Sequence, residues 1–262
     1  MIGVPQNLYS ASNAARLALR CLDLTSLNDA DTSADIEALC ARAQTPYGRV
    51  AAVCVWPRFV GLARSLLHSD IRVAAVANFP KGRLDAAAAV AEVHAILAAG
   101  GDEIDVVLPY GAFLQGQNPA CQEFLQAVRA ACGTQVLKVI IESGVLHTPS
   151  RIVRATKLAL ACGADFVKTS TGKTAISATP AAAEQMLQEI ASCKRVAGFK
   201  ASGGIRTVAD AGAYLDLVTH YLGAKALVPA RFRLGASSLL DDILRVLSAQ
   251  APVAPDATQA RK

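Results

Sequence analysis

The chain has 262 residues, 53% of them hydrophobic, and a formal net charge of +5. This length suits one closed eight-fold β/α barrel in a single domain, and the modest charge, without a lysine or arginine run, argues against a nucleic-acid partner. No stretch reaches the roughly 18 uncharged apolar residues of a membrane span, which argues against a membrane partner; a phosphorylated small molecule remains compatible with the charge.

The predicted elements alternate between short apolar strands and alanine-rich amphipathic stretches. A short helix from about Ser10 to Arg20 comes first. Such alternation gives parallel strands joined by right-handed crossovers, so eight units favour an α/β fold with a single (β/α)8 TIM barrel over a doubly wound sheet. The eight strand segments are, in chain order, LRCLDLT, VAAVCVW, RVAAVAN, EIDVVLP, LKVIIES, FVKTS, RVAGFKAS and RFRLGAS.

The two ends of the chain fall outside this repeat. We place the barrel domain in residues 1–250 and predict a disordered tail over residues 251–262, where Pro, Ala and polar residues dominate. The first twenty residues lack the charged front and apolar stretch of a secretory signal. We therefore expect a cytoplasmic protein.

The first two predicted strands carry Asp23 and Cys54 on candidate inward faces. Asp23 either binds a substrate hydroxyl or pairs with a lysine, whereas Cys54 is expected to be a small buried apolar residue. The seven cysteines are scattered, with no CxxC pair and no histidine at metal-ligand spacing. They are predicted to be reduced thiols, and we expect no metal site.

The fourth predicted strand supplies a carboxylate near the catalytic end of the barrel. Active sites of such barrels lie at the C-terminal ends of the strands, and Asp105 lies closer to that end than Glu103 on the same face. Asp105 either transfers protons or only pairs with the lysines described below. Lys138 comes early in the fifth strand, toward the barrel bottom, where a charge usually supports stability.

Two lysines end neighbouring strands. Phe166, Lys168 and Ser170 share one face of the sixth strand, and Lys200 holds the equivalent place in the seventh. If these faces line the barrel, the two ammonium groups are neighbours, and like charge together with burial lowers the pKa of at least one of them. A neutral amine can attack a carbonyl to give an iminium ion, which makes cleavage of a nearby carbon–carbon bond feasible.

Three glycine-containing turns are predicted to converge after the late strands. Free amides at a helix start beside serine hydroxyls make an anion site, and these loops commonly bind phosphate in barrels, although Gly and Ser also serve simply as turn and cap residues. Lys173 either grips this anion or is a solvated surface lysine. The turns are Thr171-Gly172-Lys173, Gly203-Gly204 and Gly235-Ala236-Ser237-Ser238, the last of which opens the helix SLLDDILRVL.

These segments resemble the deoxyribose-phosphate aldolase family over nearly the whole chain, from about Leu22 to Leu247. The combination is specific, because two of the motifs each place a lysine beside a glycine turn. The matching motifs are LDLTSLND, TPYGRVAAVCVWPRF, VANFPKG, DEIDVVLPYGAF, LKVIIESG, GADFVKTSTGK, VAGFKASGGIRT and RLGASSLL.

The resemblance implies a role for each of three residues. Lys168 would form the Schiff base, Lys200 would lower its pKa, and Asp105 would act in proton transfer. The implied reaction is reversible cleavage of 2-deoxy-D-ribose 5-phosphate to D-glyceraldehyde 3-phosphate and acetaldehyde, without metal or organic cofactor, in deoxynucleoside catabolism. Some family members end in a tyrosine that assists catalysis, whereas the last tyrosine here is Tyr221, so a catalytic contribution of the tail is in doubt.

Two other functions fit parts of the sequence. One is a different Schiff-base lyase that acts on a keto acid or a longer sugar phosphate. The other is a catalytically silent barrel that binds a sugar phosphate; two rim lysines with an aspartate argue against it, because binding alone needs no neutral amine. A homodimer is the default expectation for a soluble enzyme.

Overall fold

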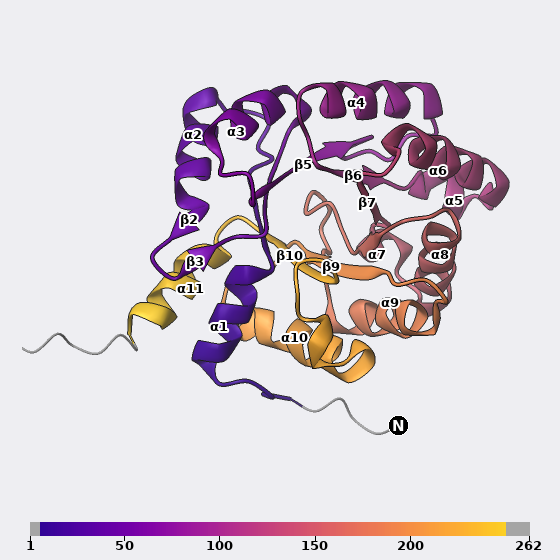
Figure 1. The fold of residues 1–262 in the computed structure, drawn as a ribbon. Coiled ribbons are helices and arrows are strands. Elements are labelled where there is room, and N and C mark those ends of the chain that lie inside the picture. The colour runs from indigo at the N-terminus through magenta and orange to yellow at the C-terminus, as the bar shows by residue number, and fades with distance from the viewer. Residues whose placement is uncertain (1–5, 250–262) are drawn as a thin grey trace, which may run out of the picture.

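The computed structural model describes residues 6–249 (Figure 1). Eight parallel strands close into a barrel in the order β1-β10-β9-β8-β7-β6-β5-β4, which confirms the predicted (β/α)8 TIM barrel. Each strand overlaps one of the eight predicted segments. The strands are β1 (Leu22–Thr25), β4 (Ala52–Val55), β5 (Arg72–Ala77), β6 (Glu103–Val107), β7 (Val136–Ile140), β8 (Phe166–Lys168), β9 (Gly198–Ser202) and β10 (Phe232–Ala236).

Helices surround the barrel (Figure 1). Among the described residues, none of them is long and apolar enough to cross a membrane. They are α1 (Ala11–Arg20), α2 (Ser33–Arg42), α3 (Val60–Leu66), α4 (Ala86–Ala98), α5 (Tyr110–Leu114), α6 (Asn118–Cys132), α7 (Ser143–Leu146), α8 (Pro149–Ala161), α9 (Pro180–Ser192), α10 (Val208–Leu222) and α11 (Leu239–Ser248), with 3-10 turns η1 (Pro57–Phe59) and η2 (Ala224–Ala226).

A small hairpin of β2 (Gln44–Thr45) and β3 (Gly48–Arg49) lies outside the barrel and was not predicted. Strands of two residues are too short to leave an alternating pattern in the sequence. Pro46 and Tyr47 form its turn, and Gly48, the first residue of β3, has a φ of +129°, which favours glycine.

The predicted N-terminal helix is confirmed as α1. The Ser10 side chain accepts a hydrogen bond from the Asn13 amide and so caps the helix start. The helix buries Ala14, Ala18 and Leu19 and packs against α10 and α11. The predicted tail, residues 251–262, lies outside the described residues.

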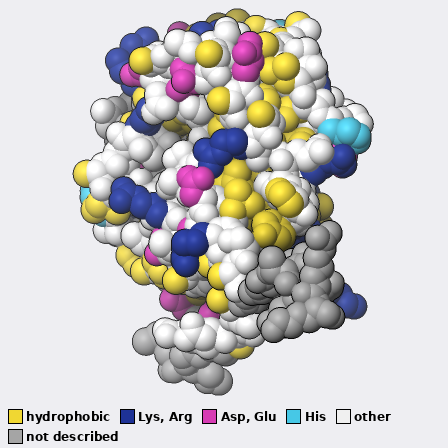
Figure 2. Space-filling view, turned by 90° about the vertical axis from the view of Figure 1, so that its left-hand side faces the viewer, with side chains coloured by type: hydrophobic (Ala, Val, Ile, Leu, Met, Phe, Trp, Pro, Cys, Tyr) yellow, Lys and Arg dark blue, Asp and Glu magenta, His cyan; other side chains and the backbone are white. Residues whose placement is uncertain are grey.

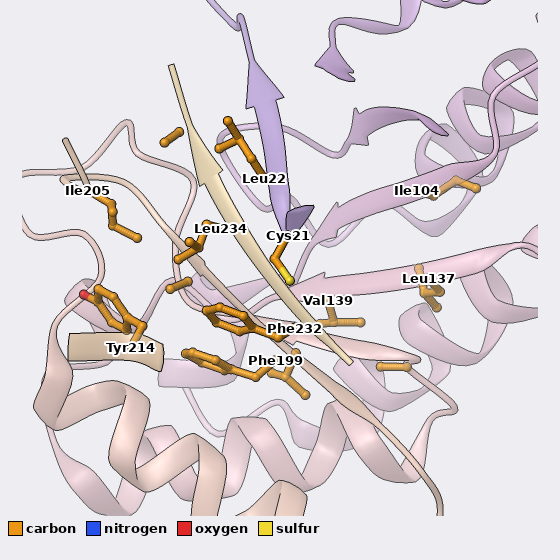
Figure 3. Packing of buried hydrophobic residues seen from close by; sticks show 14 of the residues in the cluster. Cys21, Leu22, Ile104, Leu137, Val139, Phe199, Ile205, Tyr214, Phe232 and Leu234 are labelled. Carbon is orange, nitrogen blue, oxygen red and sulfur yellow. The ribbon is translucent and has the colours of Figure 1, made fainter. Parts of the chain in front are cut away.

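Alternation along the strands separates the outer core from the barrel interior. In β6, Ile104 and Val106 belong to the buried apolar cluster beneath the helices, whereas Glu103 and Asp105 between them face the opposite side. In the same outer layer, Phe199 of β9 and Phe232 of β10 stack with ring centroids 6.4 Å apart (Figure 3). Truncating such a buried ring to alanine typically costs about 3–5 kcal/mol.

Charges of both signs are interspersed on the surface shown in Figure 2, and its hydrophobic side chains occur in small groups between polar atoms. Exposed ion pairs such as Arg49–Asp70, at 2.6 Å, contribute at most about 1 kcal/mol each. The buried cores therefore carry the stability of the fold.

Candidate active site

The barrel interior holds a network of buried charges where such barrels usually carry branched apolar side chains. The network has four cations and three carboxylates, so one positive charge is in excess when all are ionised. Each of these side chains comes from an inward-facing position of β1, β6, β7, β8, β9 or β10. They are Asp23, Glu103, Asp105, Lys138, Lys168, Lys200 and Arg233.

Asp105 is the centre of this network. Its Oδ2 accepts from the amines of Lys168 at 2.8 Å and Lys200 at 2.7 Å, and its Oδ1 accepts from Lys138 at 2.7 Å. The two lysines predicted to be neighbours therefore share one oxygen atom. Burial alone would raise the pKa of Asp105, but the three ammonium groups outweigh it and hold that pKa well below its usual value.

The other three cations of the network each contact a second carboxylate. Lys200 donates to Asp23 at 2.5 Å, and Lys138 lies 2.6 Å from Glu103. Arg233 donates to both Asp23 and Glu103, each at 2.6 Å. Lys168 alone in this network has a single carboxylate partner, and it shares that oxygen with Lys200.

The pKa values of the two lysines diverge for this reason. Burial, joined by the charge of Lys200, lowers the pKa of Lys168 below its usual value, because Asp105 alone compensates only in part. Burial also opposes the charge of Lys200, but Asp105 and Asp23 together raise its pKa above the usual value. The expectation that one lysine has a depressed pKa is met by Lys168, and losing its proton would leave the network neutral.

Apolar side chains line the interior beside these charges. They form a separate buried cluster of Leu27, Cys54, Ala74 and Val76, with Trp56 and Phe79 packed against it. Cys54 is fully buried, as predicted, and burial raises the pKa of its thiol. This apolar wall excludes water from one side of the lysines.

The predicted glycine turns converge on one cavity of about 270 Å³ at the C-terminal ends of the strands. The turns that follow the strands of Lys168 and Lys200 thus form its walls. All nine residues of these predicted turns line it: Thr171, Gly172, Lys173, Gly203, Gly204, Gly235, Ala236, Ser237 and Ser238. The remaining lining comes from Thr25, Ser26, Leu27, Asn28, Ser202, Ile205 and Arg206.

The lining of this cavity carries positive charge. Its lining includes Lys173 and Arg206 but no carboxylate, and neither side chain forms an ion pair with any residue from 6 to 249. The backbone amides of Gly172, Gly204 and Ser238 also find no acceptor within that described part of the chain. Two free cations with unpaired amides suit a phosphate group.

For three residues named in the sequence analysis, the structure adds to or changes what was expected. Asp23 takes the second of its two considered roles: it pairs with Lys200 and does not line the cavity. The backbone of Lys138 lies low in the barrel, beside Phe166, but its long side chain reaches Asp105, so its assignment to stability alone was incomplete. Gly235 lies within β10 rather than in the turn after it.

The position of Gly235 has a packing reason. A Cβ there would lie 2.7 Å from the Ser202 hydroxyl and 3.0 Å from the Lys200 Cε. Only glycine leaves room for the Lys200 side chain to cross β10 toward Asp23 on β1.

Sequence reasoning missed Arg206 and Glu142. Arg206 stands two residues after the Gly203-Gly204 turn, so a cation directly behind a glycine turn was the signal that could have found it. Glu142 gave no usable signal, because it follows β7 and its partners lie some thirty residues further along the chain. No group of three or more His, Cys, Asp or Glu side chains in residues 6–249 is arranged to hold a metal ion.

Comparison with known proteins identifies the family. Residues 17–243 match the model of the DeoC/LacD family aldolases. The chain belongs to this family. It is 49% identical over 248 residues to the deoxyribose-phosphate aldolase of Agrobacterium fabrum, a match that covers 94% of this chain and 96% of the relative. The protein is therefore an enzyme, an aldolase of the carbon–carbon lyase class.

Solved structures agree with the barrel fold. A candidate deoxyribose-phosphate aldolase from Coccidioides immitis is 30% identical with a TM-score of 0.81, covering 94% of this chain and 91% of that one. A deoxyribose phosphate aldolase from Aeropyrum pernix, described as a tetramer, has a TM-score of 0.71 at 24% identity and covers 92% of this chain and 94% of its own. The latter likeness concerns the fold alone.

Proposed function

We propose that the enzyme reversibly cleaves 2-deoxy-D-ribose 5-phosphate to D-glyceraldehyde 3-phosphate and acetaldehyde through a Schiff base on Lys168, in cytoplasmic deoxyribonucleoside catabolism. The observation that carries the proposal is the position of Lys168. Its amine pairs with one shared carboxylate oxygen, and the turn that follows its strand, Thr171–Lys173, lines the anion cavity. The name of the Agrobacterium relative supports the choice of substrate.

The neutral amine of Lys168 begins the reaction. It attacks the C1 aldehyde of the open-chain sugar, and loss of water gives an iminium ion. The positive nitrogen draws electrons from the C2–C3 bond as the C3 hydroxyl loses its proton, which releases glyceraldehyde 3-phosphate and leaves an enamine. Protonation of C2 and hydrolysis of the resulting iminium then release acetaldehyde and restore the amine.

Asp105 and Lys200 serve this cycle from their places beside Lys168. Asp105 stays ionised and touches the nucleophile, so it can hold the water that carries protons to and from C2 and the C3 oxygen. Lys200 stays protonated between two carboxylates, and its charge favours the neutral form of Lys168. Lys138 and Arg233 keep the carboxylates in place.

The cavity above the lysines binds the phosphate. Lys173 and Arg206 neutralise the dianion, and the free amides of Gly172, Gly204 and Ser238 donate to its oxygens. Binding of the phosphate orients the sugar. Its aldehyde end then points toward Lys168, and the C1–C2 fragment lies beside the apolar wall of Cys54, Ala74 and Val76.

An activity assay tests the proposal. The protein is incubated with 2-deoxy-D-ribose 5-phosphate, and acetaldehyde is measured by its reduction with alcohol dehydrogenase and NADH, with Lys168→Leu as the matched control. We expect release of acetaldehyde by the natural chain and none above background by the variant. Absence of acetaldehyde from the natural chain at high enzyme concentration would refute the proposed reaction.

A further inference from the structure

Glu142 is a buried carboxylate that the proposed mechanism does not use. It follows β7 at the catalytic end of the barrel, adopts a left-handed conformation with φ of +54°, and has 0% of its surface exposed. No cation of residues 6–249 lies within ion-pair distance of it. Burying a carboxylate without a counter-ion is costly, so hydrogen bonds to its oxygens must offset the lost hydration.

Those partners all lie on the segment between β8 and α9. The Thr171 amide donates to both carboxylate oxygens of Glu142, at 3.2 and 3.4 Å. The Thr174 hydroxyl shares its one proton between Glu142 Oε1 at 3.2 Å and the Ile176 carbonyl at 3.1 Å. Every contact uses Glu142 as an acceptor. A carboxylate, which has no donor of its own, fits such a place better than an amide would.

The neighbours of Glu142 hold the same segment. The Ser143 amide donates to the Thr169 carbonyl at 2.8 Å. Gly144 packs so closely that a Cβ there would lie 1.9 Å from the Ile176 carbonyl oxygen. Residues 142–144 therefore clamp the chain from Thr169 to Ile176, and Glu142 is the part of this clamp that touches the turn of the anion cavity.

The clamp contacts the Thr171–Lys173 turn of the anion cavity through the Thr171 amide. Thr171, Gly172 and Lys173 line the cavity. The Thr171 hydroxyl accepts a hydrogen bond from the Lys173 amide at 3.0 Å. Glu142 accepts from the Thr171 amide, and the Thr171 hydroxyl accepts from the Lys173 amide. Of the three amides in this turn, only that of Gly172 therefore has no partner in the described chain. The turn is thus fixed with one free donor and the Lys173 side chain at the cavity.

We propose that Glu142 is a positioning residue for anion binding: it sets the Thr171–Lys173 turn and so determines the preference of the enzyme for a phosphorylated over an unphosphorylated sugar. The proposal rests on the proposed function for its substrate. Its anion-binding part stands on the cavity alone and can be tested without turnover.

The first experiment measures kcat/KM for 2-deoxyribose 5-phosphate and for free 2-deoxyribose. Loss of hydrogen bonds to a charged group weakens binding by about tenfold to a hundredfold, so we expect Glu142→Ala to lower the ratio of the two kcat/KM values by that factor, mainly through KM of the phosphorylated sugar. Glu142→Gln, which keeps one acceptor oxygen, should recover part of the ratio. Glu123→Ala, which removes an exposed glutamate of α6, should leave the ratio unchanged.

The second experiment measures the dissociation constant of inorganic phosphate by calorimetry, which needs no aldolase activity. We expect a roughly tenfold or larger increase for Glu142→Ala. A smaller increase is expected for Thr174→Val, which removes the hydroxyl with its contacts to Glu142 and the Ile176 carbonyl but keeps the Thr171 amide contact to Glu142. If Glu142→Ala does not fold, Thr174→Val and Glu142→Gln decide the question.

The outcomes separate this proposal from the proposed function. Equal losses on both sugars with unchanged phosphate affinity would overturn the role of Glu142, since support of the barrel alone affects both substrates alike. If the natural chain cleaves no deoxyribose phosphate, the proposed function fails, and the phosphate affinities of the variants still decide for or against the positioning role.

Discussion

Lys168 and Lys200 donate to the same atom, Oδ2 of Asp105, at 2.8 and 2.7 Å. Two ammonium groups on one oxygen repel each other, and the proton is lost more easily from the group with less compensation. Lys200 has Asp23 as a second partner, whereas Lys168 has none in this network. This asymmetry favours Lys168 as the nucleophile independently of any family resemblance.

The division of labour between the two lysines predicts where a covalent adduct forms. Borohydride reduction in the presence of acetaldehyde should give a stable secondary amine, and peptide mass spectrometry should place it on Lys168. Lys168→Leu should abolish specific trapping at every pH. Lys200→Leu should retain some trapping at high pH only, because removing the Lys200 charge raises the pKa of Lys168. An adduct on Lys200 in the natural chain would reverse the two roles.

The same asymmetry predicts opposite effects on stability. The pKa of Lys168 is lowered in the folded state, so burial of this ionisable amine costs stability at pH 7, and this cost fades as pH rises toward the usual lysine value of about 10.4. The pKa of Lys200 is raised, so its charge stabilises the fold below that value. At pH 7 we expect Lys168→Met to stabilise by about 1 kcal/mol, roughly 2–4 °C in Tm.

Lys200→Met should instead destabilise, by about 3–5 kcal/mol, because it leaves Asp23 and Asp105 with less positive charge. Thermal unfolding at pH 7 and pH 10 measures both variants, and the gain of Lys168→Met should shrink at the higher pH. A lower Tm for Lys168→Met at pH 7 would contradict the inferred cost of the Lys168 charge.

The anion cavity predicts a strong dependence on the substrate phosphate. Free deoxyribose should be a much poorer substrate, and Ser238→Asp should raise KM for the phosphorylated sugar by about tenfold or more with less effect on kcat, because a carboxylate would face the dianion. Steady-state kinetics with both sugars provide the test. Equal kcat/KM for phosphorylated and free sugar in the natural chain would mean that the cavity does not bind the phosphate.

Gly235 predicts a packing effect on the lysine network. Gly235→Ala places a Cβ 2.7 Å from Ser202 and 3.0 Å from Lys200, so it should displace the Lys200 side chain, lower kcat and destabilise by about 1–3 kcal/mol. Gly212→Ala on α10 is the matched control, because a Cβ there meets nothing within 4 Å. Kinetics and thermal unfolding compare the two, and natural kcat in Gly235→Ala would exclude the predicted displacement.

The sequence predicts that the tail is dispensable. Removal of residues 251–262 should leave kcat nearly intact, since no tyrosine follows Tyr221 and few apolar residues could anchor the segment. Kinetics of the truncated and full chains, with circular dichroism as a check of folding, decide this. A large fall in kcat with an intact fold would show that the tail takes part in catalysis.

The sequence by itself determined the barrel and the orientation of its key side chains. Eight regularly spaced apolar strands separated by helices leave few topologies, and period-two alternation puts Asp105, Lys168 and Lys200 on interior faces. The glycine turns after the late strands were predictable for the same reason, because a parallel barrel brings all strand ends to one rim.

Only the tertiary structure decided how these residues are paired. Asp23 and Lys200 are 177 positions apart and meet because β10 closes the barrel against β1. The reach of Lys138 to Asp105 depends on side-chain length across the interior, and the contact of Glu142 with Thr171 depends on how two loops pack. Spacing along a chain does not predict such contacts, because they arise from closure of the barrel and from the packing of its side chains and loops.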